Sequence, residues 1–407
     1  MWGSSLLRVP RSGVGNAPNL AAGYEISDDK TVITVYLRPG AKWSDGHPFT
    51  SEDIRFMYDD MHNTEPAGQV YTWHATGRIL QTEVIDDYTI KLICPGGIGV
   101  TPMSLASWNG SQTNAYQAAH YLKKWHITYN EDAEKIAKEE GFDTWYECFN
   151  SHSVWFGNNL DLDLPKMTPW YPVQQTTTTE LHERNPYYWA VDEAGNQLPY
   201  IDSAIVQIVD PEVYQLKVSG GEADIAWSGL SFDNVALYMS SADSGNYGVE
   251  LHPGALGNAV ALMPANAYYD PAERELWKNV KFRQALSVAV DREDINESVY
   301  SGYGVPRQCA PLPSTSFYKE EWGEYYAQYD PALANKLLDE VGLNKKDSDG
   351  HRLRPDGKLL SIVMQYYTDT DLPTLELVRE YWEAVGLKTT IKFGDAGLVE
   401  ERLFNKE

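Results

Sequence analysis

Residues 280–306, VKFRQALSVAVDREDINESVYSGYGVP, constrain the fold more than any other part of this chain, because they predict two helices in series. The first of these helices carries apolar residues at helical spacing: Val280, Phe282, Ala285, Leu286 and Ala289. Such a stripe must be buried against another element. Asp291 is expected to end this helix and to cap the next one by accepting from backbone amides, and Gly302 supplies the left-handed residue that ends the second helix. Two capped helices in series form a rigid block and are typical of a large α/β protein.

The length and the charge of the chain limit the classes of protein to which it can belong. A chain of 407 residues is too long for one compact core, so two or three domains are expected. The chain has 58 Asp and Glu residues against 33 Lys and Arg, which gives a net charge of −25, and it has no basic run. Such a surface repels phosphate backbones, which excludes nucleic acid as a partner.

Three cysteines, Cys94, Cys148 and Cys309, are isolated in the sequence, and no pair of them has the spacing of zinc ligands. We expect them to be small buried hydrophobic residues, with one disulfide as the alternative. No metal site and no cofactor are expected. No apolar run is long enough to span a membrane, and the start, MWGSSLLRVPRSGVG, lacks the long apolar core of a secretory signal.

A strand, a turn and a helix are predicted near the start of the chain. Residues 31–38, TVITVYLR, alternate in a way that indicates a strand with both faces at least partly covered. The Asp45-Gly46 pair predicts a tight turn. Thr50, with Asp53 three positions later, predicts a capping box at the start of a helix.

The amino-acid sequences of several long segments indicate a family. Residues 25–58, which include ISDDKTVITVYLRPGAKWSDGHPFTSEDIRFMY, and the helix pair at 280–306 resemble extracellular solute-binding proteins of family 5. These are the oligopeptide- and dipeptide-binding components of ABC importers. RNPYYWAVDEAGNQLPYIDSAIVQIV, YDPALANKLLDEVGL and EYWEAVGLKTTIKF resemble the same family, so the resemblance runs from residue 18 to residue 393 and is weakest from 66 to 170. Within it, Trp43 is expected to fill the core beside the turn rather than to bind a ligand.

The resemblance implies an α/β fold of the periplasmic-binding-protein type II, with two lobes joined by a hinge and an inserted extra domain. Its domains would be residues 1–17 as a remnant of the first domain, 18–165 as the second, inserted domain, 166–262 as the first domain, and 263–407 as a third domain that is incomplete at its C-terminal end. The chain is expected to cross between the lobes near residues 261–266. Family members are longer at both ends, so the sequence is expected to be an internal fragment or a truncated gene product, which by itself binds little.

The C-terminal part predicts a helix, a hairpin and a crossover. The Asp330-Pro331 pair begins a helix that Gly342 ends. KDSDGHRLRPDGK is expected to form a charged, hairpin-like loop. A strand, a helix and a strand follow, with the two strands parallel and the crossover right-handed: residues 359–366, 372–385 and 387–393.

Residues 220–230, GGEADIAWSGL, supply the candidate ligand site. They follow a predicted helix and are expected to end in a strand that meets a new loop. The resemblance implies that the residues after the Gly-Glu-x-Asp-Ile segment enter the ligand cleft. The candidate ligand-binding residues are Trp227, Ser228, Gly229, Trp108 and Asn266. The alternative for Trp227 is a place in the core.

Of two other patterns, one is open to two interpretations and one has a structural explanation. Residues 66–128 are loop-rich and aromatic, which fits either a packed surface lobe or a ligand cleft. Asp192, Asn196 and Asp202 fail the spacing of a twelve-residue calcium loop, so a polar turn is expected there.

The function that the resemblance implies is the capture of peptides, or of a related small solute, outside the cytoplasmic membrane and their delivery to an ABC permease. The protein would be a monomer in the periplasm or outside the cell, with a lipid anchor as one option, and its export signal would lie outside this sequence. Oligosaccharides, opines and nickel chelates are the alternative solutes of this family.

Two other classes of function stay open. A hydrolase with paired carboxylates would use the many acidic residues, but these lie in predicted caps, turns and exposed helix faces. The sequence has no nucleophile elbow, no HExxH motif, no phosphate loop and no Cys/His pairing, so no catalytic residue is assigned. The third interpretation is a scaffold lobe that does not close around a solute. A ligand-dependent change of tryptophan fluorescence would indicate a receptor rather than such a scaffold.

Overall fold

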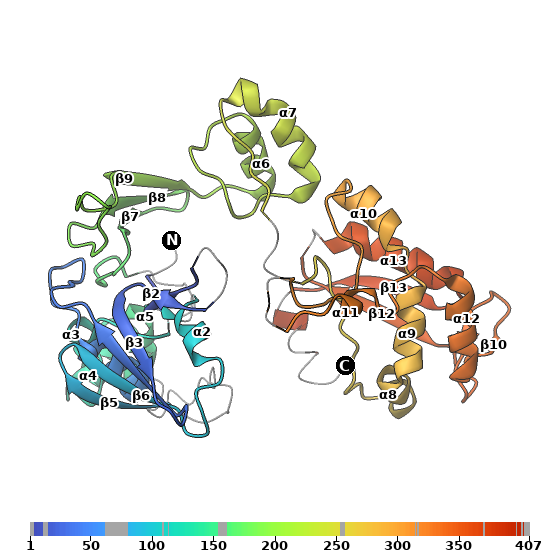
Figure 1. Cartoon of the computed structure of the whole chain (residues 1–407), viewed down its shortest axis with the longest axis horizontal. Coiled ribbons are helices and arrows are strands. Elements are labelled where there is room, and N and C mark those ends of the chain that lie inside the picture. Colours follow the sequence, from blue (N-terminus) through green and yellow to red (C-terminus); the bar gives the residue numbers. More distant parts are fainter. Residues whose placement is uncertain are drawn as a thin grey trace. The chain divides into compact units, whose positions relative to one another are not determined.

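The computed structural model describes residues 4–10, 15–61, 80–107, 110–112, 114–153, 161–252, 257–313, 315, 317–368, 371–395, 397–399 and 402 (Figure 1). The chain forms two compact units of mixed α/β structure, Met1–Val209 and Asp210–Glu407. The finer domain boundaries given above, and the hinge near residues 261–266, stay a prediction.

The first unit contains a four-stranded antiparallel sheet. Its strands lie in the order β3 (Ala21–Ile26), β4 (Val32–Leu37), β6 (Thr89–Ile93) and β5 (Gln81–Asp86). β4 lies inside this sheet, with Ile33, Val35 and Leu37 buried and the alternate residues half-buried. This confirms the strand predicted at 31–38, including the partial cover of both faces.

A turn and a short helix follow β4. Gly46 has a φ of +89°, and its amide donates to the Trp43 carbonyl at 2.9 Å, as expected of a tight turn. Helix α1 (Ser51–Arg55) begins after Thr50, whose backbone amide donates to the Asp53 carboxylate at 2.9 Å. Trp43 is fully buried, and its indole N–H donates to the same carboxylate at 3.2 Å. The turn and Trp43 are therefore structural, as predicted.

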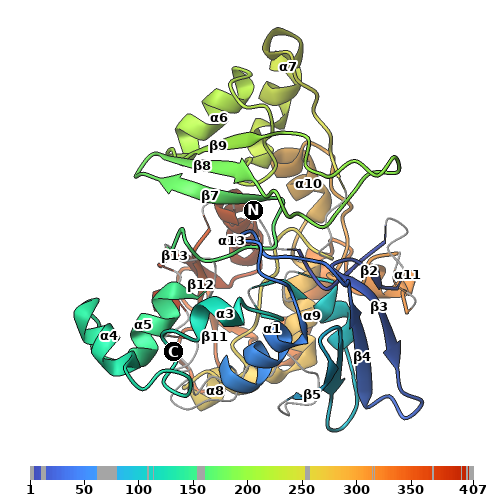
Figure 2. The same cartoon turned by 90° about the vertical axis from the view of Figure 1, so that its left-hand side faces the viewer.

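The rest of the first unit consists of short helices and two smaller sheets. Its helical segments are η1 (Phe56–Met61), α2 (Thr101–Leu105), α3 (Ala119–Leu122), α4 (Ala133–Glu139) and α5 (Trp145–His152). Its other strands are the pair β1 (Leu7–Arg8) and β2 (Ala17–Pro18), and the antiparallel sheet of β7 (Trp170–Gln175), β8 (Thr179–Arg184) and β9 (Ser203–Gln207). Helix α4 lies beside α5 (Figure 2). Before β9, Asp192 accepts from the Asn196 amide at 2.7 Å, which confirms a polar turn.

The helix pair predicted at 280–306 is part of the second unit. It forms α9 (Val280–Val288) and α10 (Arg292–Tyr300). The Asp291 carboxylate accepts from two amides in the first turn of α10, each at 3.1 Å, so the predicted cap is confirmed. Gly302 has a φ of +75°, as expected of a residue that ends the second helix.

The apolar stripe of α9 is buried except at its start. Phe282, Ala285, Leu286 and Ala289 are at most 7% exposed, whereas Val280 is 55% exposed. The inclusion of Val280 in the stripe was therefore wrong. Two residues turn a helix by about 200°, which places Val280 on the side opposite to Phe282.

A parallel strand pair and its connecting helix complete the core of the second unit. β12 (Ser361–Tyr366) pairs in parallel with β13 (Lys388–Phe393), and α13 (Leu372–Ala384) connects them. Trp382 of α13 is 5% exposed, and its indole N–H donates to the Leu286 carbonyl in α9 at 3.0 Å. The predicted order of strand, helix and parallel strand is confirmed.

The remaining elements of the second unit are mostly helices. They are α6 (Pro211–Ser219), η3 (Phe232–Asn234), α7 (Val235–Gly245), α8 (Pro271–Lys278), α11 (Glu320–Glu324), α12 (Pro331–Glu340) and the hairpin of β10 (Lys345–Lys346) with β11 (Arg352–Leu353). Asp330 caps α12 by accepting from the Leu333 amide at 2.8 Å, and Gly342 after this helix has a φ of +90°. The predicted helix and the predicted hairpin are both confirmed.

Candidate functional site

The predicted ligand segment, residues 220–230, is a loop between α6 and η3. Near its start, Gly221 has a φ of +74° and lies against Gly245 at the end of α7. A Cβ atom at Gly221 would lie 2.2 Å from the Gly245 carbonyl oxygen. Only glycine fits such a backbone position, so the start of the loop packs directly against the end of α7.

The strand expected at the end of this segment is not formed, and all of residues 220–230 belong to the described part of the chain. A strand needs a neighbouring strand to bond its backbone, whereas here a side chain of α6 takes that place. Gln215 Nε2 donates to the Gly229 carbonyl at 2.8 Å. Gln215 Oε1 accepts from the Ser231 amide at 3.3 Å and from the Tyr238 hydroxyl. The expectation of a strand was therefore wrong, and Gln215 holds the loop instead.

Trp227, Ser228 and Gly229 lie exposed at the end of this loop. Trp227 is 70% exposed, so the alternative that it is a core residue is wrong. Gly229 has a φ of +75°, and the ring of Tyr214 in α6 lies 3.6 Å from the position of a Cβ atom there. The indole is thus presented to solvent on a backbone that α6 supports.

The residue that opens η3 attaches this loop to the helix pair. The ring centroid of Phe232 lies 6.0 Å from that of Tyr300 and 5.9 Å from that of Tyr303. The Tyr303 hydroxyl also lies 3.8 Å from Met239 Sδ in α7. The loop and the α9–α10 block therefore belong to one packed arrangement.

Of the other two predicted ligand residues, Asn266 belongs to the described part of the chain and Trp108 does not. Asn266 is exposed, and its backbone amide donates to the Pro264 carbonyl at 2.9 Å. Within the ranges that the structure describes, no hydrogen bond or ring contact joins Asn266 to Trp227. Trp108 lies outside the described residues. The structure thus groups three of the five candidates, and these are neighbours in sequence.

The aromatic stretch of the first unit contributes to a core. Tyr116 is fully buried and Trp125 is 3% exposed. The ring of Tyr116 packs edge-on against Trp43 and Phe49, with centroids 5.8 and 5.1 Å away. For these residues, the packed lobe is the correct one of the two interpretations.

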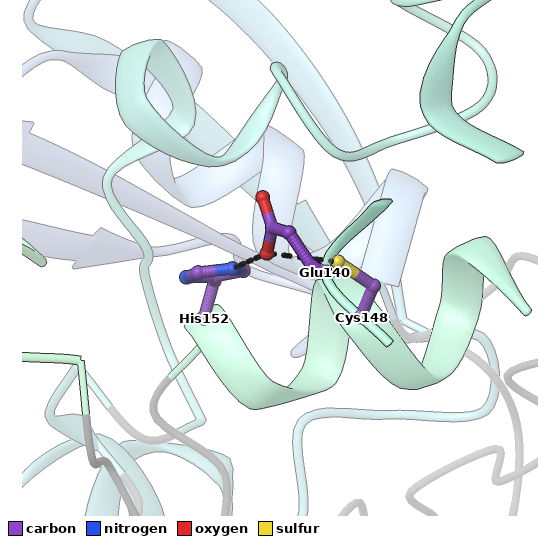
Figure 3. A group of neighbouring side chains, drawn as sticks. All are labelled: Glu140, Cys148 and His152. Carbon is purple, nitrogen blue, oxygen red and sulfur yellow. Dashed lines mark hydrogen bonds and ion pairs between the residues drawn. The ribbon is translucent and has the colours of Figure 1, made fainter. Parts of the chain in front are cut away.

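A group of polar side chains in the first unit was missed by the sequence analysis. Cys148 and His152 lie one turn apart on α5 and both point towards Glu140, at the end of α4 (Figure 3). Glu140 Oε2 lies 3.4 Å from Cys148 Sγ and 2.7 Å from His152 Nε2. On the other side of the ring, His152 Nδ1 lies 2.6 Å from Asp161 Oδ2. Cys148 and His152 thus both contact Glu140, and their four-residue spacing on a helix was the signal that the sequence analysis missed.

Burial and hydrogen bonds set the electrostatics of this group. Burial and the nearby Glu140 carboxylate raise the pKa of the Cys148 thiol to about 12. Burial also acts to raise the pKa of Glu140, but hydrogen bonds from His152 and Trp125 outweigh it and lower that pKa.

The three cysteines differ in environment, and all are free thiols. Cys94 and Cys148 are buried, as expected. Cys309 is exposed, so the expectation for it was wrong. It lies in a segment without regular structure, where its thiol donates to Asn258 Oδ1 at 3.2 Å rather than packing in a core.

No helix in the described ranges combines the length and the apolar character that crossing a membrane requires.

The sequence matches the profile of the bacterial extracellular solute-binding proteins, family 5 Middle, over residues 16–407. It is 29% identical over 408 residues to the periplasmic alpha-galactoside-binding protein of Rhizobium meliloti (strain 1021), covering 95% of this chain and 55% of that protein. It is 26% identical over 379 residues to the glutathione-binding protein GsiB of Pectobacterium atrosepticum, covering 93% of this chain and 61% of that protein. The chain therefore spans between 55% and 61% of the length of these two relatives.

Solved structures resemble this fold over nearly its whole length. The oligopeptide-binding protein OppA has a TM-score of 0.68 and 34% identity, covering 98% of this chain and 63% of OppA. The periplasmic binding protein MelB of Agrobacterium fabrum, in complex with stachyose, has a TM-score of 0.73 and 25% identity, covering 98% of this chain and 60% of MelB. These likenesses confirm the periplasmic-binding-protein type of α/β fold that the sequence predicts.

Proposed function

Because the chain belongs to the bacterial extracellular solute-binding proteins of family 5, we propose that it is the substrate-binding protein of an ABC transporter. It captures a peptide or another small solute outside the cytoplasmic membrane and delivers it to the permease. The observation that carries this proposal is the family match over residues 16–407, which is almost the whole chain. The 34% identity to the oligopeptide-binding protein OppA favours a peptide.

We propose further that the protein is non-enzymatic and monomeric and that it lies in the periplasm or at the cell surface, with a lipid anchor as one form of attachment. The name of the Rhizobium meliloti relative supports the periplasmic location. The acidic residues with structural partners support a role without catalysis. Asp291 and Asp330 cap helices, and Asp53 accepts from the Trp43 indole and from backbone amides.

The proposed solute site is the exposed loop that carries Trp227, Ser228 and Gly229. An indole on a supported backbone offers a flat apolar surface, while the Ser228 hydroxyl and the loop backbone offer hydrogen bonds. A peptide can be held by such main-chain bonds, with its side chains in permissive, hydrated pockets. Asn266 and Trp108 are proposed as further contacts.

An oligosaccharide is the second candidate solute, because two of the similar proteins are named for or contain one. The Rhizobium meliloti relative is named as an alpha-galactoside-binding protein, and the MelB structure contains stachyose. The exposed face of Trp227 suits the apolar face of a sugar ring as well as an apolar peptide side chain.

Affinity selection tests both solutes in one experiment. A purified version of the protein that is as long as its relatives is mixed with an equimolar pool of glutathione, short peptides, stachyose and other alpha-galactosides, and native mass spectrometry identifies the compounds that stay bound. Retained peptides support the first candidate, and retained galactosides support the second. Cleaved compounds in the pool would indicate a hydrolase, and a pool from which nothing is retained would count against the proposal. Calorimetry with each retained compound then gives its Kd.

A further inference from the structure

The cluster of Glu140, Cys148 and His152 in the first unit has no part in the proposed function. Its carboxylate oxygen, thiol sulfur and ring nitrogen all lie within 4.8 Å of one another. We infer that these three side chains bind a divalent transition metal ion, and Zn²⁺ is the ion whose preferred ligands they match. The inference does not depend on which solute the protein binds.

Two helices bring the three ligand atoms together. Cys148 and His152 are four residues apart on α5, so their side chains share one face of the helix. The start of α5 is fixed by Thr144, whose hydroxyl oxygen accepts from the Glu147 amide at 3.2 Å. Glu140 is the residue directly after α4, which lies beside α5. The arrangement therefore rests on the packing of α4 against α5, the start of which is capped.

Two distances from Glu140 Oε2 can be compared with those of a zinc site, and the distance from Cys148 Sγ to His152 Nε2 is at most 4.8 Å. With a Zn–S bond of about 2.3 Å and Zn–N and Zn–O bonds of about 2.0 Å, tetrahedral ligand atoms are roughly 3.3–3.6 Å apart. Cys148 Sγ and Glu140 Oε2 are already 3.4 Å apart. Glu140 Oε2 and His152 Nε2 are 2.7 Å apart and have to separate by about 0.6 Å. Glu140 is exposed, so a small rotation of its side chain provides this movement.

His152 lies between two carboxylates, so one of its ring nitrogens is free to bind a metal ion while the other keeps a hydrogen-bond partner. A neutral imidazole donates from only one nitrogen, so the lone pair on its other nitrogen would face a carboxylate oxygen at 2.6 or 2.7 Å. Either a second ring proton or a metal ion removes this repulsion. With the metal on Nε2, the Nδ1–H still donates to Asp161, which is the usual orientation of a metal-bound histidine.

Further contacts hold in place the two carboxylates on either side of His152, those of Glu140 and Asp161. The Trp125 indole N–H donates to Glu140 Oε1 at 3.0 Å, which leaves Oε2 directed at Cys148 and His152. The same indole stacks on the His152 ring with centroids 3.8 Å apart. The Tyr121 hydroxyl donates to Asp161 Oδ2 at 2.8 Å. Ligands that are supported in this way are typical of metal sites.

Metal binding at this cluster displaces protons. The Cys148 thiol loses its proton to solvent, because the thiolate is the form that binds a metal. The ring gives up the proton on Nε2 wherever it carries one there. One divalent ion thus replaces up to two protons, and a water molecule completes its four ligands.

A second group, Asp347, Asp349 and His351, also brings potential ligand atoms close together, but a polar turn explains it. Asp347 Oδ1 accepts from the amides of Asp349 and His351 at 2.9 and 2.8 Å. Such bonds are usual for Asp in a turn. This group supplies a matched control for the test.

Titration with Co²⁺ tests the inference, because a thiolate ligand gives Co²⁺ an intense charge-transfer absorption band. The purified protein is first treated with a chelator and is then titrated with Co²⁺, followed by Zn²⁺ in competition. We expect the band to saturate at about one equivalent of Co²⁺ and to disappear when Zn²⁺ is added. Cys148→Ser should abolish the band, whereas Cys94→Ser and His351→Gln should keep it.

A further variant distinguishes a metal site from a purely structural cluster. Asp161→Asn should keep the band but lower the affinity for Zn²⁺ by about 10- to 100-fold, because Asp161 orients the ligand rather than binding the ion. Circular dichroism without metal checks that each variant is folded. The inference is wrong if the wild-type protein shows no charge-transfer band at saturating Co²⁺, or if the band survives Cys148→Ser.

Discussion

Replacing Trp227 by alanine separates a ligand-binding tryptophan from a structural one. Trp227 is 70% exposed, which leaves 30% of its surface buried. A fully buried tryptophan removes up to about 250 Å² from water, so about 75 Å² is buried here. At about 25 cal/mol per Å², this area contributes at most about 2 kcal/mol. We therefore expect Trp227→Ala to lower the free energy of unfolding by only about 1–2 kcal/mol.

The same substitution should affect solute binding more strongly. A central aromatic contact is worth about 1–3 kcal/mol in binding, so the Kd should rise about 5- to 150-fold. Urea unfolding followed by far-ultraviolet circular dichroism measures the stability, because this signal does not depend on the tryptophan that is removed. Calorimetry on the longer version used for affinity selection, with the compound retained there, measures the Kd.

Two other tryptophans of the second unit serve as controls. Trp382 is 5% exposed, so Trp382→Ala should lower the free energy of unfolding by about 3–5 kcal/mol. Trp322 is 42% exposed in α11, so Trp322→Ala should leave the Kd within about twofold of the wild-type value. The reasoning is refuted if Trp227→Ala destabilises the protein as much as Trp382→Ala, or binds solute as well as Trp322→Ala does.

Two further substitutions test the cores of the units. Burial raises the pKa of Asp53 from its ordinary 3.8 to about 7, although three N–H groups donate to its carboxylate. Because the folded state then binds the proton more tightly, the free energy of unfolding should fall by up to about 4 kcal/mol as pH rises from about 4 to about 7. Urea unfolding at several pH values should show this loss in wild-type protein and not in Asp53→Asn. Arg352 is 2% exposed and donates to two backbone carbonyls and two side chains. Arg352→Met should therefore lower the free energy of unfolding by about 3–5 kcal/mol. Lys336→Met at an exposed position of α12 should change stability by less than about 0.5 kcal/mol, and equal effects in the two variants would contradict the assignment.

Much of the fold could be predicted because its signals are local. The cap at Asp291 depends on amides two and three residues further on, and the Gly46 turn depends on a carbonyl three residues back. The strand at 31–38 was evident from alternation alone. Val280 shows the limit of such reasoning, since it lies off the apolar face although it is as hydrophobic as the residues on that face.

The features that were missed depend on contacts between elements. Gln215 holds the loop through Gly229, fourteen residues away, and no local pattern marks a glutamine for that role. Glu140 meets Cys148 and His152 only because α4 packs beside α5. A search for cysteine pairs could not find this cluster, because its ligands are of three different residue types.

The support under the loop also explains why Trp227 and its neighbours are better candidates for solute contact than Asn266. An ordered loop loses little conformational entropy when a ligand binds, so more of the contact energy appears as affinity. The 220–230 loop is bonded to α6 through Gln215 and packed against α7 at Gly221. Asn266 is exposed, and its backbone amide donates a hydrogen bond only to the carbonyl of Pro264, two residues back along the chain. A contact made by Trp227 therefore needs less ordering of the protein than a contact made by Asn266.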